Sequence, residues 1–204
     1  MVRTPVFVRG SAFVLAICFA SSQPLAAKPA TSPAPIEQRV DNLEPGHWVW
    51  QPERAPSGEV EVVVSIPLQK AYVYRGGTLI GASTVSTGKP GHDTPAGRFN
   101  ILQKREKHFS NLYDNAPMPF MQRLTWDGIA LHAGAIPGEP ASHGCIRLPK
   151  TFAAKLFAAT ELGATVLVVD DAPSPEAAYA MLSGQSLPVA MGGPDEPLDT
   201  AEAP

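Results

Sequence analysis

Short hydrophobic segments separated by turn residues dominate the chain between residues 57 and about 170. Residues 60–66 are dense in β-branched side chains, which favour strands. Residues 71–74 and 79–85 are two further apolar segments, and they flank Arg75-Gly76-Gly77-Thr78. The two glycines can adopt the positive φ of a tight turn, so the pattern predicts a β-hairpin here.

The same alternation continues through the middle of this region. A turn at 93–97 leads into an expected strand over 99–102, whereas residues 103–122 are less regular and are expected to form a loop over a cleft. Residues 129–131 form another short apolar segment, which is expected to be a strand that carries His132 at its end.

One convincing helix is predicted, over residues 151–162, where apolar residues recur at helical spacing and Gly163 provides a C-terminal stop. Residues 165–169 are then a buried strand, and 177–182 could add a short helix. Mostly strands with one main helix predict a mainly β fold, a β-sandwich or barrel-like domain with short helical decorations.

The N-terminal 27 residues have the pattern of a secretory signal. Arg3 and Arg9 supply positive charge, residues 11–20 are an apolar stretch too short to span a bilayer, and residues 25–27 offer a small-residue cleavage site. We therefore expect export to the periplasm or cell envelope, with no stable membrane span after signal cleavage. The alternative is that the stretch is retained as a membrane anchor.

Proline is concentrated in the two flanks of the hydrophobic region. Residues 28–56 carry six prolines and little periodicity, and residues 171–204 carry six more together with Gly192-Gly193. Such composition is typical of unstructured connections. We expect a Pro-rich linker over 28–56, one compact domain over 57–170, and a Pro/Gly-rich, largely disordered tail over 171–204.

Charge and cysteine content limit the classes of function that the chain can have. The formal net charge is −3, and Lys and Arg form no stripe of the kind that neutralises phosphates, so nucleic acid is excluded as a partner. Of the two cysteines, Cys18 lies in the signal, which leaves Cys145 without a partner in the mature chain. An unpaired thiol in an oxidising compartment is either buried and inert or used chemically.

Two histidines, a serine and this thiol occur within fourteen residues, from His132 to Cys145. An imidazole near a thiol can take its proton, which is the minimum for covalent acyl transfer. Gly144 lets the backbone bend, so that the N–H groups of Gly144 and Cys145 could face a developing oxyanion. Each residue also has a structural interpretation: Cys145 as a small buried hydrophobe, His132 as a core histidine, and Arg147 as a surface ion-pair partner.

At these residues the chain resembles the L,D-transpeptidases with the YkuD-type catalytic domain. Ser142-His143-Gly144-Cys145-Ile146-Arg147-Leu148 has the form of the family signature, preceded by the strand-end His132. Three upstream blocks are also similar: 68–74, 85–89 and 94–99. The resemblance covers residues 60 to 169.

This resemblance implies that Cys145 attacks a peptidoglycan stem tetrapeptide, releases the terminal D-alanine and forms a thioester, which an amine or water resolves. It implies His132 as the base, oriented by the Ala133 carbonyl, with oxyanion donors at Gly144 and Cys145. Ser142 and His143 would shape the loop and Arg147 would bind substrate. The acceptor would be a stem peptide or a wall-anchored protein, and such chemistry needs no metal or organic cofactor.

One departure concerns the loop before the signature: only nine residues separate His132 from Ser142, fewer than in many family members. The loop that walls the cleft is thus expected to be short, and a more open site favours water as the acceptor. A thiol hydrolase of the same substrates therefore stays an alternative. Two other classes stay open, namely a zinc site formed by His132, His143 and Cys145, and a non-catalytic wall-binding module.

Overall fold

The computed structural model describes residues 35–110 and 115–185. The predicted signal at 1–27 therefore lies outside the described residues, as does the end of the tail. No helix within the described ranges is long and apolar enough to cross a membrane.

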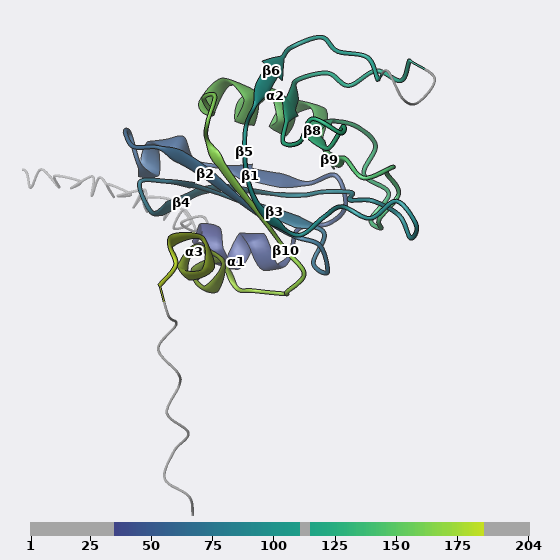
Figure 1. Ribbon diagram of the computed structural model, residues 1–204. Coiled ribbons are helices and arrows are strands. Elements are labelled where there is room, and N and C mark those ends of the chain that lie inside the picture. Colours follow the sequence, from purple (N-terminus) through teal and green to yellow (C-terminus); the bar gives the residue numbers. More distant parts are fainter. Residues whose placement is uncertain (1–34, 111–114, 186–204) are drawn as a thin grey trace, which may run out of the picture. The chain divides into compact units, whose positions relative to one another are not determined.

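The larger sheet has six strands and is built around a meander of three (Figure 1). Strands β2, β3 and β4 pair antiparallel in succession, and the β3–β4 turn carries Gly76 and Gly77 at positive φ, as the sequence predicts. Strand β10, which precedes α3 in the sequence, pairs parallel with β2. The order is β1-β4-β3-β2-β10-β5, with β1 at Trp48–Trp50, β2 at Val60–Ser65, β3 at Lys70–Arg75, β4 at Thr78–Thr84, β5 at Gly97–Asn100 and β10 at Thr165–Val169.

The smaller sheet has four strands in the order β6-β7-β8-β9. These are β6 at Gln103–Arg105, β7 at Met121–Arg123, β8 at Ala130–Ala133 and β9 at Ile146–Leu148. The region 103–122, expected to be a loop, thus has a strand at each end, because β6 and β7 pair antiparallel. Ser110 and residues 116–119 of this region line the pocket described below.

The main core lies between the two sheets and helix α2, which spans Lys150–Ala159. Phe152, Ala153 and Leu156 of α2 are buried there against strand residues such as Val62 and Leu131. The mainly β fold with one main helix is confirmed. The helix ends before the predicted 162, because Thr160 adopts an extended conformation and its hydroxyl binds the Leu156 carbonyl at 2.9 Å.

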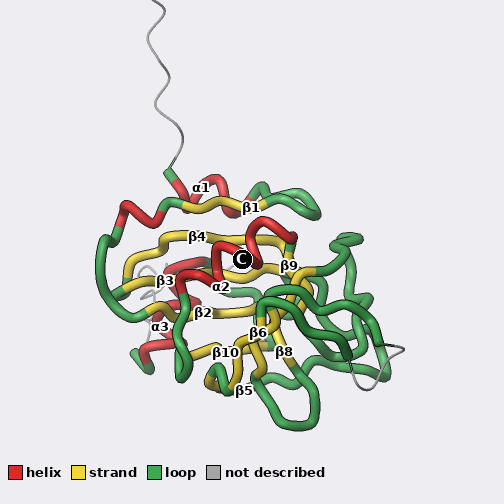
Figure 2. Tube along the Cα trace, turned by 90° about the horizontal axis from the view of Figure 1, so that it is seen from above, coloured by secondary structure: helices red, strands yellow, loops and turns green. Residues whose placement is uncertain are grey.

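The other face of the larger sheet is covered by two short helices, α1 at Ile36–Asp41 and α3 at Pro175–Ser183 (Figure 1). The helix α1 differs from the linker predicted over 28–56, whereas α3 contains the short helix expected over 177–182 of the tail. The flanks contain enough apolar side chains to cover the sheet: Ile36 and Val40 of α1 and Leu182 of α3 are buried in one cluster. Figure 2 shows α1 beside β1, near one edge of this sheet.

Proline content misled the prediction because the prolines mark element ends rather than disorder. Pro175 occupies the first turn of α3, where a missing N–H costs nothing, and Ser174 caps that helix by accepting from the Ala177 N–H. Pro52 likewise starts a short 3₁₀ helix, η1, at Pro52–Arg54. The segment before η1 forms β1, which pairs antiparallel with β4.

Two tyrosine hydroxyls hold the C-terminal flank against the sheet. Tyr72 donates to the Pro173 carbonyl at 3.2 Å and Tyr74 to the Pro175 carbonyl at 2.6 Å, and both side chains are buried. Burial raises the pKa of Tyr72 to about 12, with Asp41 and Glu176 acting in the same direction. Both hydroxyls are therefore neutral donors at physiological pH.

Removing the Tyr74 hydroxyl tests whether α3 is part of the folded unit. Tyr74→Phe leaves the Pro175 carbonyl without its donor, so the free energy of unfolding should fall by about 1 kcal/mol in urea titrations. Tyr179→Phe is the matched control, because the Tyr179 hydroxyl has no hydrogen-bond partner in the described chain, and its stability should be unchanged. Equal stability of both variants would contradict the docking of α3.

Candidate active site

Parallel pairing of β8 with β9 brings the site together. The pairing places His132 opposite Arg147, and Leu131 opposite Ile146. Because side chains alternate along a strand, Leu131 and Ile146 face the core, where both are fully buried. His132 and Arg147 then share the opposite face, and Cys145, two residues before Arg147, lies on that face as well.

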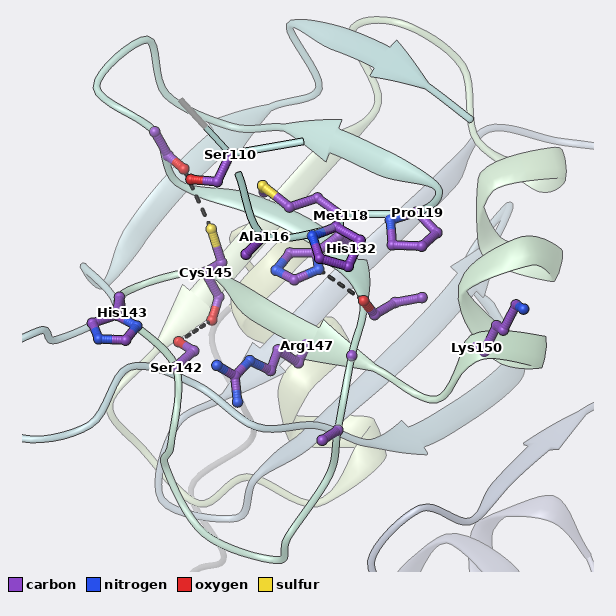
Figure 3. A pocket seen from close by; sticks show the side chains of 15 residues that line it. Ser110, Ala116, Met118, Pro119, His132, Ser142, His143, Cys145, Arg147 and Lys150 are labelled. Atoms are coloured by element: carbon purple, nitrogen blue, oxygen red, sulfur yellow. Dashed lines mark hydrogen bonds between the residues drawn. The ribbon is translucent and has the colours of Figure 1, made fainter. Parts of the chain in front are cut away.

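A pocket of about 580 Å³ opens over this face (Figure 3). Its wall from the β6–β7 segment includes Ser110, Met118 and Pro119, which the sequence did not single out. All the predicted site residues except Gly144 line it: His132, Ala133, Ser142, His143, Cys145 and Arg147.

His132 is held in one tautomer and is 8% exposed. Its Nδ1 lies 2.9 Å from the Ala133 carbonyl oxygen, which only accepts, so Nδ1 carries the hydrogen and Nε2 keeps its lone pair. Burial lowers the pKa of His132, the Ala133 hydrogen bond opposes this, and the charge of Arg147 lowers it further. The ring is therefore a neutral base near pH 7.

The Cys145 thiol is half-buried beside Met118, Met121 and Ala130. Its Sγ donates to the Gly128 carbonyl at 3.3 Å, and Figure 3 shows the sulfur directed toward Ser110 and away from Ser142. Burial raises the pKa of this thiol, while the Ala130 amide and the charge of Arg147 act in the opposite direction. No hydrogen bond joins the thiol to the imidazole of His132 in the described structure. The resting pair is a neutral thiol and a neutral imidazole.

Ser142 braces the loop that presents the thiol. Its hydroxyl donates to the Cys145 carbonyl at 2.5 Å and accepts from the Gly144 N–H at 3.1 Å. The Gly144 N–H is thus already engaged, which corrects its expected role as an oxyanion donor. The Cys145 N–H has no acceptor in the described part of the chain and is the amide open to an oxyanion.

Gly144 is required for the shape of this loop. Its φ is +109°, and a Cβ at this position would lie 2.9 Å from Ile129 Cδ1. The positive φ favours glycine, and an added Cβ would also have to displace the end of the Ile129 side chain. The contribution of Gly144 is therefore backbone geometry rather than hydrogen-bond donation.

Thr94 connects the loop to the larger sheet, a role that the sequence did not indicate beyond its place in the 94–99 block. Its hydroxyl donates to the Gly144 carbonyl at 2.8 Å and accepts from the Gly88 N–H at 2.8 Å. A Cβ on Gly88 would lie 1.9 Å from the His92 carbonyl oxygen, so the close approach of these two backbone segments also requires glycine. The upstream blocks thus contact the loop at 142–145 through Thr94.

Comparison with known proteins identifies the family of this chain. The L,D-transpeptidase catalytic domain (YkuD) matches residues 59–169, which is more than half of the chain. The chain belongs to the L,D-transpeptidase family. Both the predicted resemblance and the assignment as an enzyme of this family are confirmed.

Solved L,D-transpeptidases have a similar fold. One from Mycobacterium smegmatis is 26% identical with a TM-score of 0.51, covering 54% of this chain and 58% of that one. One from Stackebrandtia nassauensis is 27% identical with a TM-score of 0.53, covering 68% and 66%. A third, an L,D-transpeptidase in complex with imipenem, is 28% identical with a TM-score of 0.50, covering 54% and 58%.

The chain thus spans less than two thirds of the length of these transpeptidases. No protein of curated function matches its sequence.

The remaining predicted residues lie at the rim of the transpeptidase pocket. His143 is exposed, with its ring edge-on to His92 at 4.8 Å between centroids. The stem of Arg147 passes over Gly134, where a Cβ would lie 2.9 Å from Arg147 Cγ. The zinc alternative has no support, because no three His, Cys, Asp or Glu side chains in the described ranges are grouped to hold a metal ion.

The ionisation of Cys145 can be measured directly by alkylation. Because burial raises its pKa above the ordinary thiol value of 9.0, the iodoacetamide rate in the free protein should rise with pH to a midpoint above 9. Mass spectrometry of the modified protein follows the reaction, and Cys145→Ala gives the background. A midpoint below 7 would indicate a preformed thiolate–imidazolium pair and contradict this description.

Proposed function

We propose that this protein is a cysteine acyltransferase that acts on peptidoglycan stem peptides. The thiol of Cys145 attacks the carbonyl next to the diamino acid, releases the terminal D-alanine and retains the acyl group as a thioester. An amine then takes the acyl group, which cross-links the wall or anchors a protein to it. The observation that carries the proposal is the shared pocket of Cys145 and a His132 whose Nε2 lone pair is available.

The formation of the thioester follows from the protonation states of Cys145 and His132. As sulfur attacks the carbonyl carbon, the thiol proton passes to His132 Nε2, so that no free thiolate is needed beforehand. The developing oxyanion is met by the Cys145 N–H. When the C–N bond breaks, His132 returns the proton to the leaving nitrogen and D-alanine departs neutral at its amine.

The cations at the rim suit an acidic peptide. Arg147 and Lys150 both line the pocket, and a stem peptide carries carboxylates along its length. Arg147 is proposed to bind one of these carboxylates. Ala133 sets the His132 tautomer through its carbonyl, and Ser142 and His143 hold the loop.

Substrate and location are inferred from family membership together with the N-terminal pattern. Acting on a cell wall requires export, and we propose that residues 1–27 are the signal that directs it. The catalytic unit is proposed to extend beyond 57–170, since α1 and α3 pack on its larger sheet. The nine-residue connection between His132 and Ser142 leaves water as a competing acceptor.

Defined tetrapeptide muropeptides test the proposal. The wild-type protein should release D-alanine and form cross-linked dimers, which liquid chromatography with mass spectrometry resolves, and Cys145→Ala should form neither. Release of D-alanine without dimers identifies a hydrolase. Unchanged products from Cys145→Ala would overturn the mechanism in favour of a non-thiol activity or a wall-binding module.

The pH profile of D-alanine release tests the role of His132. The base must be neutral, and burial lowers its pKa, so kcat/KM should fall only as pH drops through a midpoint below the ordinary histidine value of 6.5. His132→Gln should lower kcat by about 100-fold or more. The fall of kcat/KM at acid pH should also disappear in this variant. His143→Gln is the control, and it should keep this fall. An acid midpoint above 6.5 would contradict the assignment.

A further inference from the structure

The block at 68–74 contains a residue in an unusual conformation that the proposed mechanism does not use. Gln69 lies in the turn between β2 and β3, and its φ is +48°. This region of backbone conformation costs free energy for a residue with a Cβ, whereas glycine adopts it readily. A strained position of this kind points to a role for the side chain that occupies it.

The side-chain amide of Gln69 holds Thr87 at two atoms. Its Oε1 accepts from the Thr87 N–H at 3.0 Å, and its Nε2 donates to Thr87 Oγ1 at 2.7 Å. Nε2 also donates to the Ile66 carbonyl at 2.7 Å, which fixes the amide within its own turn. Thr87 is fully buried, so the amide of Gln69 takes the place that water has at the surface.

Thr87 in turn holds the start of the loop at 142–145. Its carbonyl accepts from the N–H groups of Ala141 and Ser142, each at 3.0 Å. The Ser142 hydroxyl then donates to the Cys145 carbonyl at 2.5 Å. The peptide plane that follows Cys145 is therefore connected to Thr87 through Ser142.

Gly88, the next residue, is connected to the peptide plane that precedes Cys145. Its N–H donates to the Thr94 hydroxyl, which donates to the Gly144 carbonyl, both at 2.8 Å. The Gly144 carbonyl and the Cys145 N–H belong to one rigid peptide plane. The direction of the Cys145 N–H is therefore set from Gly88, and both planes that flank the nucleophile depend on the segment that Gln69 fixes.

We propose that Gln69 is a positioning residue for acyl transfer, which acts through Thr87 and Gly88 on the two peptide planes beside Cys145. Gln69 does not line the pocket, so it acts without touching the substrate. Its amide keeps the Cys145 N–H directed at the position of the oxyanion. The inference rests on the proposed function and adds to it the device that orients the oxyanion donor.

Two reactions of the same thiol separate this role from a general effect on the fold. Both the formation and the resolution of the thioester pass through an oxyanion, which the Cys145 N–H stabilises. Alkylation by iodoacetamide displaces iodide at a saturated carbon and forms no oxyanion. A change in the direction of the N–H should therefore slow acyl transfer and leave alkylation unchanged.

Replacing the amide of Gln69 tests the inference. Gln69→Met removes its side-chain hydrogen bonds and keeps an unbranched side chain of similar length. Its kcat for D-alanine release from a tetrapeptide muropeptide should fall about tenfold, because a misdirected oxyanion donor costs less than a deleted one. KM and the iodoacetamide rate should stay at wild-type values. Gln69→Gly, whose backbone is unstrained at this φ and which should therefore fold, should show the same fall in kcat.

Ser65→Ala is the matched control at the other end of the same turn. The buried Ser65 hydroxyl donates to the Asp171 carbonyl at 2.5 Å and accepts from the Leu68 N–H at 3.3 Å, so it contacts the C-terminal flank rather than Thr87. This variant should have a lower melting temperature and a wild-type kcat. An unchanged kcat in both Gln69 variants, an equal fall in Ser65→Ala, or a parallel loss of alkylation would overturn the inference. A wild-type protein that releases no D-alanine overturns the proposed function itself.

Discussion

The parallel ladder between β8 and β9 is the constraint on which the site depends. It sets His132 opposite Arg147 on the side of the pocket that Cys145 also lines, while Leu131 and Ile146 anchor the ladder in the core. A slip of β9 by one residue would turn Arg147 to the face opposite His132. The chemistry is thus fixed by the same apolar contacts that stabilise the fold.

Next to this ladder, the two reactive side chains differ in which of them carries the proton, and neither is charged at rest. The thiol and the imidazole are each neutral at rest, because burial raises the pKa of Cys145 and lowers that of His132. A neutral thiol reacts slowly with oxidants, because the thiolate is the reactive form. Proton transfer coupled to attack therefore combines reactivity with resistance to oxidation.

Sequence patterns predicted the fold class and six of the residues that line the pocket, because strands, the hairpin glycines and the Ser142–Leu148 signature are local features. What they missed depends on tertiary contacts. The engagement of the Gly144 N–H by Ser142 and the bridge from Thr94 to Gly144 join segments whose meeting no local pattern encodes. The N-terminal flank was misjudged for the same reason, since burial of Ile36 and Val40 against the larger sheet orders α1.

The central claim is that Cys145 forms a covalent acyl adduct. A similar L,D-transpeptidase has been solved in complex with imipenem, so intact-protein mass spectrometry after incubation with imipenem provides the most direct test. The wild-type protein should gain the mass of one imipenem, located at Cys145 by peptide mapping, and Cys145→Ala should gain none. An unmodified wild-type mass, or an adduct on any other residue, would contradict the account.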